Sequence, residues 1–185
     1  MQNRTKRELG ITLKNLMTKK SLEHITVKEL VTECGVNRQT FYYHFQDIYE
    51  LLGWIYKSEA LGSIDAFKTY ETWQLGFLKI FQYVEANRDF CLCTVNSLGR
   101  DHLEKFLYSL TYDLLIGVVE EVAVGFQISE SDKSFIAKFY TYGFVALMLE
   151  WLKSGAKEAP AVIIDKLDKL INGEISRAIE KYTKL

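Results

Sequence analysis

Proline is almost absent from this sequence of 185 residues: Pro160 is the single one, and no stretch is rich in proline, glycine or serine. An all-β fold needs many turns, and a flexible linker needs such a stretch, so the sequence argues against both. Hydrophobic residues make up 48% of the chain, which is enough for a substantial core and argues against disorder. The length suits one well-packed domain, or a small domain joined to a larger one.

Cysteines are few and odd in number: Cys34, Cys91 and Cys93. The stretch from Met1 to Glu8 is polar rather than apolar, so we expect no export signal and a chain with reduced thiols in the cytoplasm. One residue separates the last two cysteines and no second ligand pair follows, so neither a metal nor a cofactor is expected. No apolar run approaches the roughly 18 residues of a membrane span, so we expect no membrane partner.

Signatures of common enzyme classes are also missing. The sequence has no glycine-rich phosphate loop, no zinc-protease motif on a helix and no nucleophile elbow. The three histidines, His24, His44 and His102, are scattered along the chain. We therefore predict that the protein is not an enzyme. Two classes stay open, a nucleic-acid-binding protein and a helical adaptor that binds only other proteins.

Charge is unevenly distributed along the chain, although the net charge is only −1. Residues 1–45 hold eight Lys or Arg against four Glu, a net charge of +4, and the remainder of the chain has a net charge of −5. A basic N-terminal end on an acidic body favours an anionic partner at that end.

Apolar residues recur at helical spacing along the whole chain. A first helix is expected over residues 4–19, and longer apolar stripes begin at Trp73, Leu103 and Phe135. Pro160 stands where a first-turn proline begins a helix, which we expect to be the last one and to run over residues 160–183. The fold class predicted from this pattern is all-α.

The most informative stretch is TVKELVTECGVNRQTFYYHF, residues 26–45. Thr26 and Glu29 form a capping box that begins one helix. Gly35 lies in the following turn, where glycine permits a positive φ, and Asn37 is a favourable cap for a second helix. Two helices joined by a turn of this length are typical of a helix-turn-helix.

The second of these helices combines an apolar face with a polar one. Phe41 and Phe45, four residues apart, form the apolar face. Successive residues turn by about 100° around a helix, so the aromatic run cannot all face inward. The polar face has donors and acceptors for DNA and no carboxylate. The predicted DNA-binding residues are Thr26, Lys28, Arg38, Gln39, Thr40, Tyr42, Tyr43 and His44.

Residue chemistry suggests which of these side chains contact bases and which contact phosphates. Arg38 and Gln39 suit guanine or adenine edges in the major groove, Thr40 suits a base or a phosphate, and the tyrosines and the histidine suit phosphates. Thr26 and Lys28 stand at the beginning of the preceding helix, where free N–H groups, a hydroxyl and a positive charge favour another phosphate.

Residues 26–45 and the following DIYELL resemble the helix-turn-helix of the tetracycline-repressor (TetR/AcrR) family of bacterial regulators. Two departures stand out. The family's usual lysine after the aromatic run is replaced by Gln46-Asp47-Ile48, so one phosphate contact is expected to be missing, and Val31 stands where alanine is usual. The family pattern is met at Thr26, Leu30, Gly35, Val36, Thr40, Phe41, Tyr42, His44 and Phe45.

The resemblance implies about nine helices, with a three-helix DNA-binding domain over residues 1–48 and a helical regulatory and dimerisation domain over residues 49–185. It also implies a homodimer that binds a palindromic operator in double-stranded DNA and responds to a small-molecule effector or a partner protein. The segment YGFVALMLEWLKSGAKEAP (142–160) resembles a branch that includes activators of dihydroxyacetone-kinase operons. For that branch the resemblance implies a signal from a protein.

An effector pocket and a dimer interface are both expected in the regulatory domain. The pocket is expected between helices at 73–87, 100–124 and 130–154, although for each candidate a core residue with a satisfied polar tip is the favoured alternative. The interface is expected on the last two helices, whose apolar surface exceeds one face, although burial in the monomer explains part of it. The pocket candidates are Tyr83, Cys93, His102, Tyr108, Tyr112 and Tyr140, and the interface candidates are Phe144, Leu147, Met148, Trp151, Leu167 and Leu170.

Overall fold

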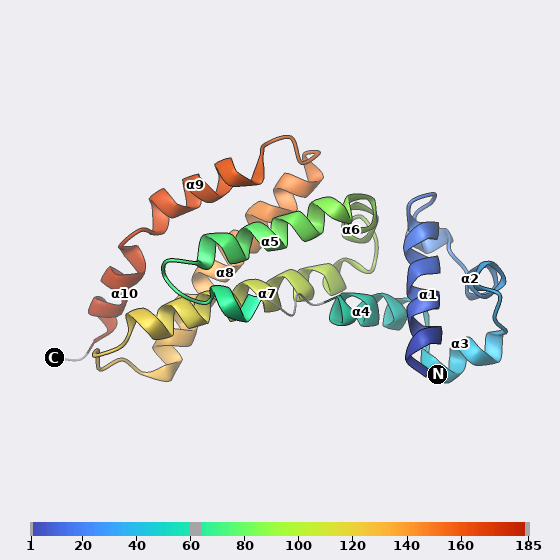
Figure 1. Cartoon of the computed structure of the whole chain (residues 1–185), viewed down its shortest axis with the longest axis horizontal. Coiled ribbons are helices and arrows are strands. Elements are labelled where there is room, and N and C mark those ends of the chain that lie inside the picture. The colour runs from blue at the N-terminus through green and yellow to red at the C-terminus, as the bar shows by residue number, and fades with distance from the viewer. Residues whose placement is uncertain (1, 60–63, 184–185) are drawn as a thin grey trace. The chain divides into compact units, whose positions relative to one another are not determined.

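The computed structural model describes residues 2–59 and 64–183, which form ten α-helices, two short 3-10 helices and no strand within those ranges (Figure 1). The prediction of an all-α fold is therefore confirmed. The α-helices are α1 (Gln2–Met17), α2 (Val27–Cys34), α3 (Arg38–His44), α4 (Ile48–Ser58), α5 (Trp73–Ala86), α6 (Arg88–Val95), α7 (Arg100–Val122), α8 (Glu130–Lys153), α9 (Pro160–Ile171) and α10 (Glu174–Tyr182). The 3-10 helices are Leu22–His24 and Ile64–Phe67.

The chain folds into two compact units, each made of two segments. The first unit comprises residues 1–60 and 87–106, and the second comprises residues 61–86 and 107–185. The first unit therefore contains α1 to α4, α6 and the beginning of α7. Helices α4 and α6 thus group with the helix-turn-helix, whereas the domain boundary expected at residue 48 stays a prediction.

Side-chain caps begin the two helices of the helix-turn-helix, and a glycine ends the first of them. The Oγ1 atom of Thr26 accepts a hydrogen bond from the backbone N of Glu29 at 3.2 Å. Helix α2 ends at Gly35, whose φ of 71° is left-handed and favours glycine. Asn37 then caps α3 by accepting from the backbone N of Thr40 at 2.7 Å. These helix ends lie where the capping pattern predicts them.

Lys14, on α1, joins two chain segments within the first unit. Its Nζ lies 2.8 Å from Oε1 of Glu59 and 2.6 Å from Oδ1 of Asn87, and the same ammonium lies 5.0 Å from the ring centroid of Phe90. Glu59 follows the end of α4, and Asn87 begins the second segment of the unit. A single ammonium group therefore holds the end of one segment against the beginning of the next.

We expect Lys14→Met to lower the free energy of unfolding of the first unit by about 1 kcal/mol, because a part-buried carboxylate and amide lose their charged donor. Lys19→Met serves as the matched control, since Lys19 is an exposed lysine close by in the chain. Denaturant unfolding monitored by circular dichroism measures the difference. Equal midpoints for the two variants would contradict this role for Lys14.

Large aromatic side chains form the core of the second unit. The ring centroids of Phe77 and Phe144 lie 4.8 Å apart, and those of Phe81 and Trp151 lie 4.9 Å apart. Trp73 also packs against Phe144, with ring centroids 5.7 Å apart. Each of these five side chains is at most 5% exposed. Helices α5 and α8 are therefore held together by aromatic packing inside this unit.

The prediction of a single last helix over residues 160–183 is wrong. This segment forms two helices, α9 and α10, so the described residues contain ten α-helices. The break lies at Asn172 and Gly173, where Gly173 has a left-handed φ of 78°. The hydroxyl of Tyr70 donates to Oδ1 of Asn172 at 2.9 Å and accepts from the backbone N of Gly173 at 3.0 Å. A side chain distant in the sequence thus satisfies the backbone at the break.

One helix within the described ranges, α8, is long and apolar enough to cross a membrane by length and composition. The expectation of no membrane span rested on uninterrupted apolar runs, whereas the mean hydropathy of a window in α8 reaches 1.2. Half of that window is buried inside the protein, as for the core helix of a helical bundle, and length and composition alone are weak evidence of a span.

A candidate nucleic-acid interface

Helix α3 is held in place by two buried phenylalanines. Phe41 is 0% exposed and Phe45 is 3% exposed, and the ring of Phe45 packs against that of Trp54 on α4 at 5.9 Å between centroids. Seven residues are too few for a helix to persist alone in water, so this packing maintains α3. Because the two phenylalanines point inward, the remaining side chains of α3 lie wholly or partly at the surface.

The surface of α3 carries the predicted DNA-binding side chains. Arg38 and Gln39 are exposed, and Tyr42 and Tyr43 are 51% and 70% exposed. The guanidinium carbon of Arg38 lies 6.0 Å from the ring centroid of Tyr42, within the range of a cation–π contact. The ring of Tyr43 meets that of the half-buried His44 edge-on at 4.9 Å. The exposed side of α3 is thus rich in hydrogen-bond donors and free of carboxylates.

Thr40, on the same helix, is half-buried and bound to the cap. Its Oγ1 donates to Oδ1 of Asn37 at 3.0 Å, in addition to the bond from its backbone N. The single proton of this hydroxyl is therefore used within the helix-turn-helix, and the oxygen keeps its lone pairs for another donor.

The beginning of α2 offers a second polar surface in the first unit. Thr26 and Lys28 are both exposed. The Thr26 oxygen accepts from a backbone N–H, so its own proton stays available to a phosphate. The nearby carboxylate of Glu29 is paired with Lys20, with Nζ and Oε2 2.5 Å apart. This pairing reduces the negative charge close to the predicted phosphate contact.

Lys6 is a basic residue near α3 that the sequence analysis did not select. Its Nζ lies 5.4 Å from the ring centroid of Phe45, the residue that ends α3. The excess of basic residues in the N-terminal segment was the available signal. Spacing alone does not indicate which lysine of α1 lies beside a residue 39 positions later, because that proximity comes from the packing of α1 on α4, against which Phe45 also lies.

Two of the six predicted effector-pocket residues belong to the first unit. The Sγ of Cys93 donates to the backbone O of Lys20 at 3.7 Å, and burial raises the pKa of this thiol. His102 lies beside Gly53, and its pKa is lowered mainly by burial and secondarily by Lys105. Both side chains thus contact residues of the unit that contains the helix-turn-helix.

The other four candidates, Tyr83 among them, belong to the second unit. Tyr108 and Tyr112 stack with ring centroids 5.9 Å apart, and the hydroxyl of Tyr112 lies 3.1 Å from Oγ of Ser134. Tyr140 is half-buried, and its pKa is raised first by burial and then by Glu174. The six candidates are therefore divided between the two units, and their part in effector binding stays a prediction.

Thr111, on α7, is a polar residue of the second unit that the sequence analysis missed. It is 0% exposed, and its hydroxyl oxygen has no hydrogen-bond partner among the residues described. A buried hydroxyl without a partner leaves hydrogen-bonding capacity that a water or a ligand can use. The available signal was a threonine between Leu110 and Leu114 in an otherwise apolar stripe.

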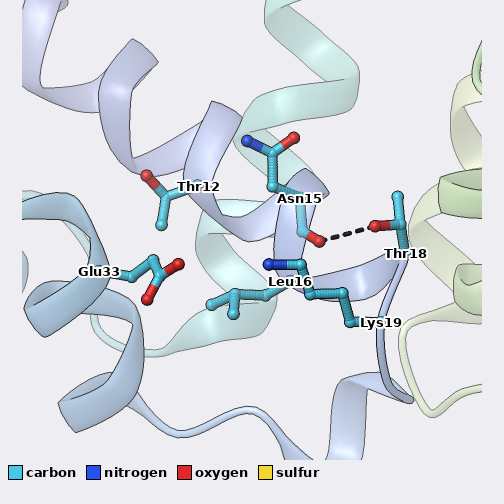
Figure 2. Close-up of a pocket in the computed structure, with 6 residues that line it drawn as sticks. All are labelled: Thr12, Asn15, Leu16, Thr18, Lys19 and Glu33. Carbon is cyan, nitrogen blue, oxygen red and sulfur yellow. Dashed lines mark hydrogen bonds between the residues drawn. The ribbon is translucent and has the colours of Figure 1, made fainter.

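A pocket of about 380 Å³ lies in the first unit, on α1, the turn after it and α2 (Figure 2). Its lining is mainly polar, and within it the hydroxyl of Thr18 donates to the backbone O of Asn15 at 2.8 Å. None of the predicted effector or DNA-binding residues belongs to this lining. The lining residues are Thr12, Asn15, Leu16, Thr18, Lys19 and Glu33.

Four of the six predicted interface residues are buried inside the second unit. Phe144, Met148, Trp151 and Leu167 are each at most 5% exposed in the single chain, as the alternative of burial in the monomer expects. The interface itself stays a prediction. Leu147 and Leu170 are 43% and 69% exposed and stay available.

Helix α8 carries a run of large apolar side chains on its outer face. Four large apolar residues of α8 are at least 43% exposed, three of them at helical spacing and the fourth further around the helix, and we call them the α8 stripe. Gly143 and Ala146 lie between them and are also exposed. Large apolar side chains that are exposed together on one helix make this face a candidate surface for a partner. The α8 stripe consists of Phe135, Phe139, Tyr142 and Leu147.

Comparison with known proteins agrees with this arrangement. The curated HTH-type dhaKLM operon transcriptional activator DhaS of Lactococcus lactis subsp. lactis (strain IL1403) is 26% identical over 155 residues, which cover 82% of this chain and 81% of that protein. The uncharacterized HTH-type transcriptional regulator YxbF of Bacillus subtilis (strain 168) is 25% identical over 168 residues, which cover 85% of this chain but only 42% of that protein.

Solved structures share the fold. A dihydroxyacetone kinase operon activator DhaS superposes with a TM-score of 0.68 and 22% identity, over 97% of this chain and 98% of that one. NalD, the secondary repressor of the MexAB-OprM multidrug efflux pump in Pseudomonas aeruginosa, superposes with a TM-score of 0.66 and 12% identity, over 96% of this chain and 98% of that one.

Family patterns match both parts of the sequence. Residues 13–53 match the family described as bacterial regulatory proteins, tetR family, and they span the helix-turn-helix. Residues 71–173, more than half of the chain, match the family described as transcriptional regulator C-terminal region. The chain therefore belongs to the tetR family of bacterial transcriptional regulators, and it is a DNA-binding regulator rather than an enzyme.

Proposed function

We propose that this protein acts in the cytoplasm as a homodimer that binds an inverted-repeat operator and places one copy of α3 in each of two successive major grooves. The observation that carries this proposal is the surface of α3. Two buried phenylalanines fix the helix, and Arg38, Gln39 and Tyr43 are exposed on it. Two such helices in a dimer suit half-sites whose centres lie about 34 Å apart.

The α8 stripe supports the proposed dimer. Tetracycline-repressor-type regulators act as dimers, and an operator with two-fold symmetry requires a symmetric protein. Phe139 is 69% exposed and Leu170, on α9, is equally exposed, so both helices carry apolar side chains that a second copy would cover. The proposed interface therefore uses the exposed residues of α8 and α9 rather than the buried ones.

The proposed signal is a small molecule or a partner protein that acts on the second unit. The unsatisfied hydroxyl of Thr111 supports a small molecule, because a bound ligand would supply the missing partner. Similarity to DhaS, which is named as an operon activator, supports a partner protein, because the resemblance of residues 142–160 to that branch implies a protein signal. In either case the affinities for signal and operator are linked reciprocally.

Selection of bound fragments from the genomic DNA of the host, with purified full-length protein at near-physiological salt, tests this function. Recovery of an inverted repeat beside a small number of promoters is the expected result. Recovery of nothing above a control with unrelated protein would contradict operator binding by the protein alone. It would then favour the alternative of a helical adaptor.

Substitutions on α3 are expected to separate base contacts from phosphate contacts. Arg38→Ala should cost about 1–3 kcal/mol of specific binding and relax the base preference at one position of each half-site. Tyr42→Phe keeps the ring beside Arg38 and removes only the hydroxyl, so it should weaken binding about equally on all sequences. Affinities measured by fluorescence anisotropy on the selected operator and on unrelated DNA distinguish the two outcomes. Unchanged affinities for both variants would contradict the docking of α3 in the groove.

A further inference from the structure

The hydroxyl group of Thr40 donates its hydrogen bond within the helix-turn-helix. Oδ1 of Asn37 accepts from both the backbone N and Oγ1 of Thr40, at 2.7 and 3.0 Å. A threonine hydroxyl has one proton and two lone pairs, so this bond uses its whole capacity as a donor. While this bond is made, the oxygen of Thr40 is an acceptor only toward any molecule outside the helix-turn-helix.

This direction decides which parts of DNA the hydroxyl can bind. Phosphate oxygens are acceptors, and they cannot pair with a hydroxyl whose proton is already donated elsewhere. On base edges in the major groove, the donors are the amino groups of cytosine (N4) and adenine (N6), whereas guanine and thymine present acceptors. An acceptor-only hydroxyl therefore distinguishes cytosine and adenine from the other two bases.

The position of Thr40 suits contact with a base. It is the third residue of α3, and the first residues of a recognition helix are those that reach base edges. The next residue, Phe41, is fully buried, while Thr40 is half-buried and Gln39 is exposed. Thr40 thus lies at the border between the buried face of α3 and the surface that carries Gln39.

Resting on the proposed function, we infer that Thr40 reads a cytosine or an adenine in each operator half-site by accepting a hydrogen bond from its amino group. Asn37 is the positioning residue that sets this preference, because it withholds the hydroxyl proton. Thr26 provides the contrast within the same motif. Its oxygen accepts from the backbone N of Glu29 and keeps its proton, so Thr26 suits a phosphate and carries no base preference.

The inference is tested with full-length protein and random-sequence DNA, by selecting bound fragments and comparing the preferred base at each position. Thr40→Val, which keeps the shape and removes the oxygen, should abolish the preference for cytosine or adenine at one position per half-site. Thr40→Ser should retain it. Thr26→Val is the matched control, and it should lower affinity on all sequences without changing the preferred bases.

Variants of the cap test the positioning role separately. Asn37→Asp still accepts both bonds, so it should retain the base preference even though its charge lowers overall affinity. Asn37→Gly is tolerated as a helix cap but releases the Thr40 proton, so discrimination at that position should decrease. Thermal unfolding of each variant establishes that α3 is intact.

A direct measurement uses the selected operator with one base replaced by an analogue that lacks only the exocyclic amino group. Loss of one hydrogen bond should weaken binding of the natural protein about three- to tenfold, and binding of Thr40→Val should not change. If the natural protein selected a defined motif and Thr40→Val preferred the same bases at every position, the inference would be overturned and the proposed function would stand. If the natural protein selected no motif, the proposed function would fail, and the inference would fail with it.

Discussion

Phe41→Ala is expected to lower the free energy of unfolding of the first unit by about 3–5 kcal/mol. The side chain is fully buried, and its ring packs against those of Tyr42 and Phe45 at centroid distances of 5.4 and 6.0 Å. Without this ring, α3 has seven residues and a single buried phenylalanine to hold it. Specific affinity for DNA should decrease as well, although Phe41 does not face the groove.

Amide hydrogen exchange of the segment 38–45 reports on this change, alongside denaturant unfolding and DNA affinity. Tyr43→Ala is the matched control, because Tyr43 lies on the same helix and is 70% exposed. It should leave stability within about 0.5 kcal/mol of that of the natural protein and still weaken DNA binding. If both variants lost DNA affinity but neither lost exchange protection, the buried role of Phe41 would be contradicted.

Local features of the helix-turn-helix could be predicted because their causes lie within a few residues. Thr26, Asn37 and the glycine between the two helices each act on a backbone group at most five positions away. The two phenylalanines of α3 follow the period of the helix, so their burial follows from spacing. The residues expected to bind DNA were then those left at the surface of α3.

Other features depend on residues distant in the sequence and could not be predicted. The break between α9 and α10 involves Asn172 and Gly173, but the hydroxyl that binds both belongs to Tyr70. The hydroxyl direction of Thr40 depends on a rotamer rather than on spacing. Likewise, the burial of Phe144 results from its contacts with α5, and periodicity within α8 does not distinguish the side that faces α5 from the side that faces a second copy.

Substitutions on the two sides of α8 are expected to have different effects. Phe144→Ala removes a ring that packs against Trp73 and Phe77, so it should lower the free energy of unfolding of the second unit by about 3–5 kcal/mol. Phe139→Ala removes a ring that is 69% exposed, and it should leave the fold of the second unit unchanged. If α8 forms the dimer interface, Phe139→Ala should instead raise the dimer dissociation constant about tenfold or more.

Protein concentration separates the two effects. A loss of core packing lowers stability by the same amount at every concentration, whereas a weakened dimer loses apparent stability most at low concentration, where monomers predominate. Sedimentation and thermal unfolding over a hundredfold range of concentration therefore assign each residue. If Phe139→Ala unfolded at a lower temperature by a concentration-independent amount and sedimented as a dimer, the stripe on α8 would not be the interface. The exposed surface on α9 around Leu170 would then be the next to test.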